Sequence, residues 1–391
     1  MTCPECGPDD GILEIQFDLK AVQKAWKKRP LADRPLNHWR YQELLPVEPG
    51  GVAAQWPVGW TPVVDAKRLA EQLGIAQVLL KDEGRNPSAS FKDRASSVGV
   101  AHALQVGAKT IACASTGNAA TSLACHAALA GLPAMIFVPQ SAPEPKLAQL
   151  LVYGATVFSV EGSYDQAYQL CSAACEQFGW YNRNCAINPV LVEGKKTGGL
   201  EIAEQSASYG GMPDWVVVSV GDGCTIAGIW KGLVEMHALG LVDRLPRLLG
   251  VQAAGVAPIP YALEHNALPP PGDGCTLADS IDVQVPRNWR KAVRALRDSD
   301  GVVVCVDDEQ IIEAIRLSGR HGVFAEPAAA AAVAGVVSGV DSKLIQPDDR
   351  VLAMVTGSGL KDTRSAIRAG GAPHSVEPTL DALASALEID L

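Results

Sequence analysis

The chain has 391 residues, more than a single hydrophobic core usually serves, so two packed lobes are expected. Hydrophobic residues make up 48% of the sequence and charged residues 19%, which is typical of a globular protein and excludes a disordered chain. A net charge of −10 without a long basic run argues against nucleic acid or an anionic membrane as the main partner.

The sequence also predicts a cytoplasmic protein. The first six residues lack the basic segment and following apolar segment of a signal peptide, and no apolar run reaches the ~18 residues of a membrane-spanning helix. Several of the ten cysteines, such as Cys113, Cys125 and Cys305, lie inside apolar segments. Such positions are typical of reduced cysteines in a protein core.

Residues 1–55 are predicted to form an N-terminal arm laid over the rest of the protein. The arm opens with Cys3-Pro-Glu-Cys6, which has the spacing of half a zinc ribbon. A structural zinc ion needs four ligands, and no second pair of this spacing occurs in the chain. The sequence therefore predicts a knuckle without metal, and metal binding by Cys3 and Cys6 would require ligands from elsewhere, such as a second subunit.

From about residue 61 onward, short β-branched runs alternate with helical segments. This pattern predicts an α/β fold of parallel sheets covered by helices on both faces, and so many strands require two sheets. We expect a larger domain of residues 56–94 and 191–391 and a smaller Rossmann-like domain of residues 95–190. The predicted strands are residues 78–81, 110–114, 134–138, 155–160, 215–220, 248–252, 302–306 and 351–355.

Lys92 stands between a turn at Asn86-Pro87 and a predicted helix that ends near residue 105. At the start of a helix, the dipole and the free N–H groups disfavour a cation and attract anions. A lysine held there is easier to deprotonate, as Schiff-base chemistry requires. An isolated lysine in this context is usually only a surface residue, so the interpretation depends on its neighbours.

Three loops supply those neighbours, because ligands of open parallel sheets bind at the carboxyl ends of the strands. Residues 115–119 offer hydroxyl and N–H groups to a carboxylate, residues 221–225 offer amides to a phosphate, and residues 356–359 offer hydroxyls. Each loop alone is more often only a turn, but with Lys92 they predict pyridoxal phosphate. The glycine motifs of dinucleotide and P-loop sites are absent from the sequence.

On these residues the chain resembles the threonine synthase branch of the fold-type II pyridoxal-phosphate enzymes. The resemblance implies two parallel-sheet lobes with the cofactor in the crevice between them, a lyase that acts on an L-amino acid, and a homodimer. It extends from about residue 61 to residue 362. The segments that carry it are residues 81–94, 115–120, 137–155, 193–197, 250–258, 322–329 and 356–362.

The same resemblance implies a role for each candidate site residue. Lys92 would form the internal aldimine and then act as the general base at Cα. Asn118 would hydrogen-bond the cofactor's 3′-oxygen, and Thr356 would face its pyridine nitrogen, which suits elimination and replacement chemistry. The residues expected to bind the cofactor phosphate through their amides are Gly221, Asp222, Gly223, Cys224 and Thr225. Those expected to receive the substrate's α-carboxylate are Ser115, Thr116 and Ala119.

One segment departs from the threonine synthase pattern. Threonine synthases bind the phosphate of O-phosphohomoserine partly through Asn-Ser-x-Asn-Pro-x-Arg, and here Cys185 and Ala186 replace the first pair and Leu191 the arginine. An arginine–phosphate hydrogen bond contributes about 1.5–3 kcal/mol. Lys195 could supply the lost charge, as could Lys146 or Arg94.

Two hypotheses about the reaction follow. The first is threonine synthase, which converts O-phosphohomoserine and water to threonine and phosphate. The alternative is a threonine or serine dehydratase, or a β-replacement enzyme such as cysteate synthase. The changed segment at residues 185–191 favours the alternative, and the overall resemblance favours the first. Asp222 beside the expected phosphate is a further departure, which requires its carboxylate to point away.

Overall fold

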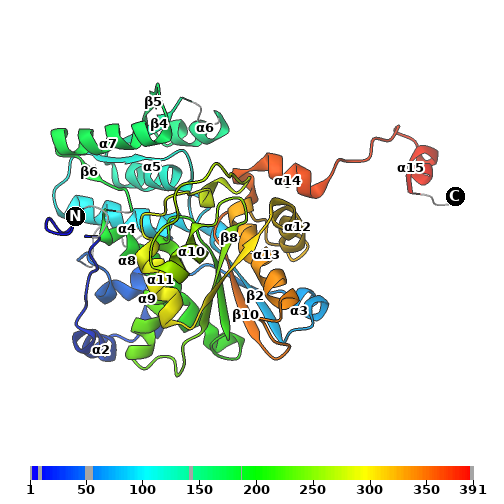
Figure 1. The fold of residues 1–391 in the computed structure, drawn as a ribbon, viewed down its shortest axis with the longest axis horizontal. Helices are drawn as coiled ribbons and strands as arrows, with labels where there is room; N and C mark the ends of the chain where they lie inside the picture. The colour runs from blue at the N-terminus through cyan, green and yellow to red at the C-terminus, as the bar shows by residue number, and fades with distance from the viewer. Residues whose placement is uncertain (1, 8–10, 49–55, 141–143, 186, 388–391) are drawn as a thin grey trace.

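The protein is an α/β molecule with two sheets, seen here in a computed structural model (Figure 1). The structure describes all residues except 1, 8–10, 49–55, 141–143, 186 and 388–391. Every strand predicted from the sequence is present, and all but one of the strands run parallel to their neighbours. The predicted fold class is confirmed.

The larger sheet has the strand order β1-β2-β10-β7-β8-β9. Its members are β1 (Val63–Asp65), β2 (Gln77–Asp82), β7 (Trp215–Ser219), β8 (Arg247–Ala253), β9 (Val302–Val306) and β10 (Arg350–Val355). Strand β7 is buried along its whole length, since helices cover both faces of the sheet, and this explains its continuous apolar sequence. Only β1, which pairs antiparallel with β2, breaks the parallel arrangement among the described strands.

The smaller sheet has the strand order β5-β4-β3-β6. Its members are β3 (Ile111–Ala114), β4 (Ala134–Pro139), β5 (Thr156–Val160) and β6 (Tyr181–Asn182). The sequence did not predict β6 or β1, because two or three residues are too few to show a period. In Figure 1 this sheet and its helices form one end of the molecule, beside the larger sheet.

Helices fill most connections between strands, and further helices precede β1 and follow β10. Those of the first half are α2 (Leu19–Lys28), α3 (Lys67–Leu73), α4 (Lys92–Gln105), α5 (Asn118–Ala130), α6 (Glu144–Val152), α7 (Tyr164–Phe178) and α8 (Pro189–Ser206). Those of the second half are α9 (Cys224–Ala238), α10 (Pro258–His265), α11 (Trp289–Asp298), α12 (Asp308–Gly319), α13 (Pro327–Asp341), α14 (Thr363–Gly370) and α15 (Leu380–Leu387). None of the helices in the described part of the chain is long and apolar enough to cross a membrane.

Helix α8 runs through the centre of the protein between α4 and α9. A Cβ atom on Gly194 would lie 2.2 Å from the carbonyl oxygen of Arg94, and one on Gly199 would lie 2.1 Å from that of Ile229. Only glycine permits these helices to approach so closely. Most residues of α8 are therefore buried, including the charged Glu193, Lys195, Lys196 and Glu201.

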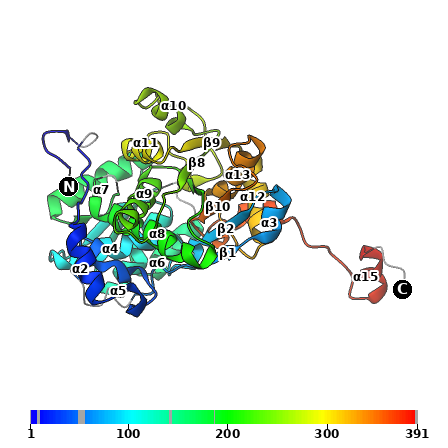
Figure 2. The ribbon, with the colours of Figure 1, turned by 90° about the horizontal axis from the view of Figure 1, so that it is seen from below.

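The arm packs against both lobes, and its residues Trp39, Leu45 and Val47 belong to the apolar cluster of the smaller sheet. Val22 and Trp26 of α2 belong to the same apolar cluster as strand β7 and helix α9. The 3₁₀ helix η2 (His38–Leu44) is anchored to α8 by Glu204, which accepts hydrogen bonds from Arg40 at 2.7 Å and from Tyr41 at 2.5 Å. At the other end of the chain, α15 stands away from the body in both views (Figures 1 and 2).

Candidate active site

A cavity of about 540 Å³ lies where the carboxyl ends of strands from both sheets meet. Helices α4, α5 and α9 all begin at its wall. Every site residue predicted from the sequence lines it. These residues are Lys92, Ser115, Thr116, Asn118, Ala119, Lys195, Gly221, Asp222, Gly223, Cys224, Thr225 and Thr356.

Lys92 is the first residue of α4, and its position is fixed from the opposite side of the cavity. The backbone N–H of Phe91 donates to the carbonyl of Thr356 at 2.8 Å, and Ser90 forms a β-bridge with Gly357. Burial, and next the positive charge of Lys195, lower the pKa of Lys92 to about 8. An amine with this pKa is neutral in about one molecule in ten at pH 7, far more often than an ordinary lysine.

The loop at residues 221–225 joins β7 to α9 and forms a cradle of backbone amides. Gly223 has φ +89°, and a Cβ atom there would lie 2.8 Å from the carbonyl oxygen of Asn288. A Cβ atom on Gly221 would lie 3.0 Å from the carbonyl oxygen of Ser280. Since the amides of this loop stand at the start of a 15-residue helix, they form a suitable site for a phosphate.

Asp222 accepts hydrogen bonds that fix the neighbouring backbone segment. Its Oδ1 atom accepts a hydrogen bond from the backbone N–H of Arg287 at 2.9 Å, and its carbonyl accepts one from that of Asn288 at 3.0 Å. The carboxylate and the backbone carbonyl of Asp222 thus together hold the segment at residues 287–288, which packs under Gly223.

Asn118, Glu326 and Thr356 lie on the third side of the cavity. The side-chain amide of Asn118, the first residue of α5, donates to Glu326 at 2.7 Å. Glu326 is the N-cap residue of α13, directly before Pro327, and it also lines the cavity. Its backbone N–H donates to the carbonyl of Gly357 at 3.0 Å, which fixes the loop that carries Thr356.

Ser115, Thr116 and Ala119 surround the start of α5. The backbone N–H of Gly117 donates to the hydroxyl of Ser115 at 3.2 Å, and a Cβ atom on Gly117 would lie 4.0 Å from Ser280 of the opposite wall. Hydroxyls and helix N–H groups therefore face a narrow part of the cavity, where they can receive a carboxylate.

The cationic side chains of the cavity gather beside Cys185. Lys195 lies in the wall together with Arg183, which is 2% exposed and donates to the hydroxyl of Ser96 at 3.0 Å. Burial would lower the pKa of Lys195, but the sulfur atoms of Cys185 and Cys224 outweigh it and raise that pKa. Lys195 is accordingly a stable cation inside the cavity.

Leu191, which stands where threonine synthases have an arginine, does not line the cavity. It is fully buried and packs against Gly99 of α4, where a Cβ atom would lie 2.5 Å from its Cδ2 atom. At the position of the family's arginine, this chain therefore has an apolar side chain that packs between α4 and α8. Ala186 lies outside the described residues, as does the side chain of Lys146.

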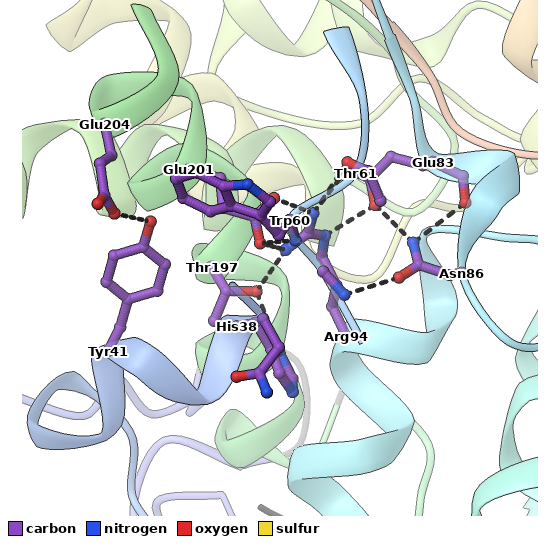
Figure 3. Close-up of polar contacts among 12 residues, drawn as sticks. His38, Tyr41, Trp60, Thr61, Glu83, Asn86, Arg94, Thr197, Glu201 and Glu204 are labelled. Carbon is purple, nitrogen blue, oxygen red and sulfur yellow. Dashed lines mark hydrogen bonds and ion pairs between the residues drawn. The ribbon is translucent and has the colours of Figure 1, made fainter. Parts of the chain in front are cut away.

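A buried charge network connects the helices that carry Lys92 and Lys195 (Figure 3). The guanidinium of Arg94 contacts Glu83 of the 3₁₀ helix η4 (Glu83–Arg85) at 2.8 Å and Glu201 of α8 at 2.6 Å. Lys81 of β2 lies 3.1 Å from Glu201, and all four side chains are fully buried. The prediction that Arg94 could supply charge to a substrate is wrong, because both its edges are occupied by carboxylates outside the cavity.

Sequence reasoning assigned no role to several residues of the cavity wall. Cys185 was noted only as a departure from the family pattern, and Arg183, two residues earlier, was not singled out. The wall also includes residues 279–285 and Arg287, whose guanidinium lies 4.1 Å from the ring centroid of Tyr168 on α7. This pair joins the two lobes over the cavity.

Cys3 and Cys6 do not line this cavity. The backbone N–H of Cys3 donates to Gly11 at 2.8 Å. Within the described residues, no group of three or more histidine, cysteine or acidic side chains is placed to hold a metal ion.

Two α/β lobes, a buried lysine and an amide cradle for a phosphate define an enzyme that binds a phosphorylated, amine-reactive cofactor between its lobes. The chain belongs to the family of pyridoxal-phosphate-dependent enzymes, whose family model matches residues 56–357. The residues present fit this cofactor. Lys92 can hold its aldehyde, and a Cβ atom on Gly221 would project toward the cavity wall at Ser280, where the phosphate cradle lies.

Relatives and solved structures agree with this assignment. The chain is 39% identical to a threonine synthase of Methanosarcina acetivorans, with 99% of this chain and 94% of the relative covered. It is 37% identical to a threonine synthase of Methanocaldococcus jannaschii, with 98% and 94% covered. Threonine deaminase isoform 2 of Solanum lycopersicum has a similar fold, with a TM-score of 0.69, 22% identity, and 79% of this chain and 87% of that chain covered.

Proposed function

We propose that this protein is a threonine synthase that converts O-phosphohomoserine and water to threonine and phosphate. The observation that carries the proposal is the identity of 37–39% to threonine synthases over nearly the whole chain. A second anion site supports it. Besides the amide cradle of residues 221–225, the cavity contains Arg183 and Lys195, which can bind a substrate phosphate.

Pyridoxal phosphate, when bound, supplies an electron sink for negative charge that develops at the substrate's Cα. Lys92 would hold the cofactor and then, as a free amine, remove and return protons at the substrate's carbon atoms. A pKa of about 8 suits this task, because the amine can accept a proton near neutral pH. Ser115, Thr116 and Ala119 would bind the α-carboxylate and so orient the substrate toward Lys92.

Asn118 and Thr356 would contact the cofactor ring, with Thr356 at the pyridine nitrogen and Asn118 at the 3′-oxygen. The hydrogen bond from Asn118 to Glu326 would keep the amide in place for this contact. The amides of Gly221, Asp222, Gly223, Cys224 and Thr225 would bind the cofactor phosphate. Lys195 would bind the leaving phosphate of the substrate, since it stays protonated beside Cys185.

A dehydratase of threonine or serine, or a β-replacement enzyme such as cysteate synthase, remains the second candidate. The observation that favours it is Cys185, whose sulfur faces Lys195 and Arg183 and offsets part of their positive charge. A smaller substrate without a phosphate would not need that charge.

The deciding experiment is a spectral titration of the cofactor-loaded enzyme with O-phosphohomoserine, phosphoserine, threonine and serine. Released phosphate and 2-oxo acid are assayed in parallel. Phosphate and threonine from O-phosphohomoserine would support the synthase. A 2-oxo acid from threonine or serine, with O-phosphohomoserine ignored, would overturn it in favour of the dehydratase, and sulfite-dependent release of phosphate from phosphoserine would indicate cysteate synthase.

Lys195→Gln tests the second anion site. Loss of a charged hydrogen bond worth about 1.5–3 kcal/mol should raise the KM for O-phosphohomoserine roughly 10- to 150-fold. Threonine serves as the internal control, because it lacks the phosphate and its binding should change little. An unchanged KM for the phosphorylated substrate would exclude Lys195 from the phosphate site.

The division into an arm (1–55), a larger domain (56–94 and 191–391) and a smaller domain (95–190) is also part of the proposal, as are a homodimer and a cytoplasmic location. The composition of each sheet, with β3 to β6 in one and the remaining described strands in the other, supports the division. Sedimentation of the purified protein would test the dimer.

A further inference from the structure

Two cysteines meet at the cavity from different lobes. Cys185 lies in the loop that follows β6 of the smaller sheet, and Cys224 is the first residue of α9, which follows β7 of the larger sheet. Their thiols are hydrogen-bonded to each other. The proposed reaction assigns no role to either sulfur atom.

The surroundings favour the thiolate form of Cys185. Nη1 of Arg183 donates to its sulfur at 3.7 Å, and Lys195 forms a further hydrogen bond with it. The hydrogen bond from Cys224, and then the charges of Lys195, Arg183 and Lys92, hold the pKa of Cys185 well below its usual range. The thiolate is the form of cysteine that attacks electrophiles.

Cys224 is suited to react as the partner thiol. It is 1% exposed, and its sulfur accepts a hydrogen bond from the side-chain amide of Asn288 at 2.7 Å. Cys185 is half-buried and lines the open cavity, so a small reagent can reach it first. Burial raises the pKa of Cys113 to about 12 and that of Cys125 to about 11. The thiol of Cys171 lowers the pKa of Cys175, but both of these cysteines are buried and neither lines the cavity.

We propose that Cys185 and Cys224 form a modification site for hydroperoxides, at which oxidation to a disulfide links the two lobes across the cofactor cavity. In the first step the Cys185 thiolate attacks one peroxide oxygen, the O–O bond breaks, and hydroxide leaves, which gives a sulfenic acid. In the second step the Cys224 sulfur attacks the Cys185 sulfur, the S–O bond breaks, and the departing hydroxide takes up the thiol proton. For hydrogen peroxide, the sum is that one thiolate and one thiol are oxidised to the disulfide and the peroxide is reduced to one water and one hydroxide.

The disulfide would change the site in two ways. It would tie the loop that contains Cys185 to the amide cradle of residues 221–225, since Cys224 belongs to that cradle. It would also remove a negative charge that raises the pKa values of Lys92 and Lys195. Neither effect depends on which amino acid is the substrate, so the inference stands apart from the proposed reaction.

The experiment treats the cofactor-loaded protein with hydrogen peroxide, blocks free thiols with N-ethylmaleimide, and maps the peptides by mass spectrometry. The starting protein carries Cys3→Ser and Cys6→Ser, so that the arm's own cysteine pair cannot form a disulfide. After oxidation we expect neither Cys185 nor Cys224 to be alkylated by N-ethylmaleimide. Both should appear in one cross-linked peptide that dithiothreitol separates. The exposed Cys275 provides the reference for an accessible thiol and should react more slowly.

Two variants separate the steps. In Cys224→Ser, oxidation of Cys185 should stop at the sulfenic acid, which dimedone captures. In Cys185→Ser, Cys224 should stay a free thiol and still be alkylated by N-ethylmaleimide after peroxide treatment. Both measurements read the thiols directly and need no enzymatic activity. If Cys185 is oxidised no faster than Cys275, or if it proceeds to sulfinic acid without a cross-link while Cys224 is intact, the proposal is refuted.

Discussion

Replacement of Arg94 by methionine would test whether the buried charge network stabilises the protein. The change keeps much of the side-chain volume and leaves Glu83 and Glu201 with Lys81 as their remaining cation in the network. Removal of one partner from a buried ion pair costs about 3–5 kcal/mol, because the other partner stays buried and uncompensated. We therefore expect a loss of this size in the free energy of unfolding.

The pKa of Glu201 gives a second estimate of the same magnitude. Burial would raise this pKa, but Arg94 and Lys81 outweigh burial and lower it from 4.5 to about 2. At about 1.4 kcal/mol per pKa unit, this corresponds to roughly 3 kcal/mol. Because the folded pKa is depressed, this stability is present above pH 4.5 and is lost as the pH falls through about 2.

The assay is urea unfolding of wild type and Arg94→Met at several pH values between about pH 7 and about pH 4. In the variant, Arg94 no longer offsets burial, so the pKa of Glu201 should be higher than in the wild type and Glu201 should take up its proton at a higher pH. The difference between the two proteins should therefore be largest near neutral pH and shrink in acid. A loss below about 1 kcal/mol, or one that does not change with pH, would refute the reasoning.

Arg34→Met is the matched control for this experiment. Arg34 is also buried and bound to one carboxylate, that of Glu43 at 2.6 Å, but the side chain of Glu43 is 21% exposed. Water can solvate Glu43 after the substitution, so the loss of stability should be smaller and less dependent on pH. Similar losses for both variants would mean that packing, and not the buried charge, sets the cost.

Three further predictions concern the cofactor site. Lys92→Ala should abolish the visible absorbance of bound cofactor and turnover while the unfolding midpoint of the cofactor-free protein stays the same; wild-type turnover would contradict the central assignment. Capture of pyridoxal phosphate by the cofactor-free protein should increase with pH, with a midpoint near 8, because neutral Lys92 is the reactive form. Lys195→Gln should move that midpoint upward, because the charge of Lys195 lowers the pKa of Lys92. A midpoint unchanged by Lys195→Gln would exclude this electrostatic coupling. Gly223→Ala should weaken cofactor binding about 5- to 150-fold, because a strained loop conformation costs about 1–3 kcal/mol. Gly131→Ala is its control, since Gly131 has φ +63° with no atom within 4 Å of an added Cβ, and equal effects on cofactor affinity would refute a specific role for the cradle.

Local sequence patterns sufficed for much of the site, because most of its residues follow a buried strand or begin a helix. Thr356 follows β10, Gly221 follows β7 closely, and Asn118 and Lys92 are the first residues of α5 and α4. The carboxyl ends of parallel strands meet at one edge of a sheet. The apolar periodicity of the strands and the glycines at their ends were therefore enough to place these residues in one crevice.

The charges were harder to assign, because a charged residue carries no sign of its partner in the sequence. The sequence favoured Lys195 as a ligand for the substrate phosphate, but it left Arg94 open as an alternative source of charge. Packing separates them, since the fully buried Arg94 is bound by Glu83 and Glu201, whereas Lys195 points into the cavity. The partner Glu201 lies 107 residues from Arg94 along the chain.

The sequence by itself determined the α/β class, all strands except β1 and β6, the reactive lysine and the loops that surround it, since these follow from short-range patterns of apolar residues, glycine and β-branching. Only the tertiary structure decided that Leu191 packs away from the cavity, that Arg183 enters it, and that Cys185 and Cys224 meet there. Contacts of this kind depend on how two lobes and a buried helix are positioned in three dimensions. That positioning is set by packing between residues distant in the chain, as at Gly194 and Gly199 of α8, and no local period encodes it.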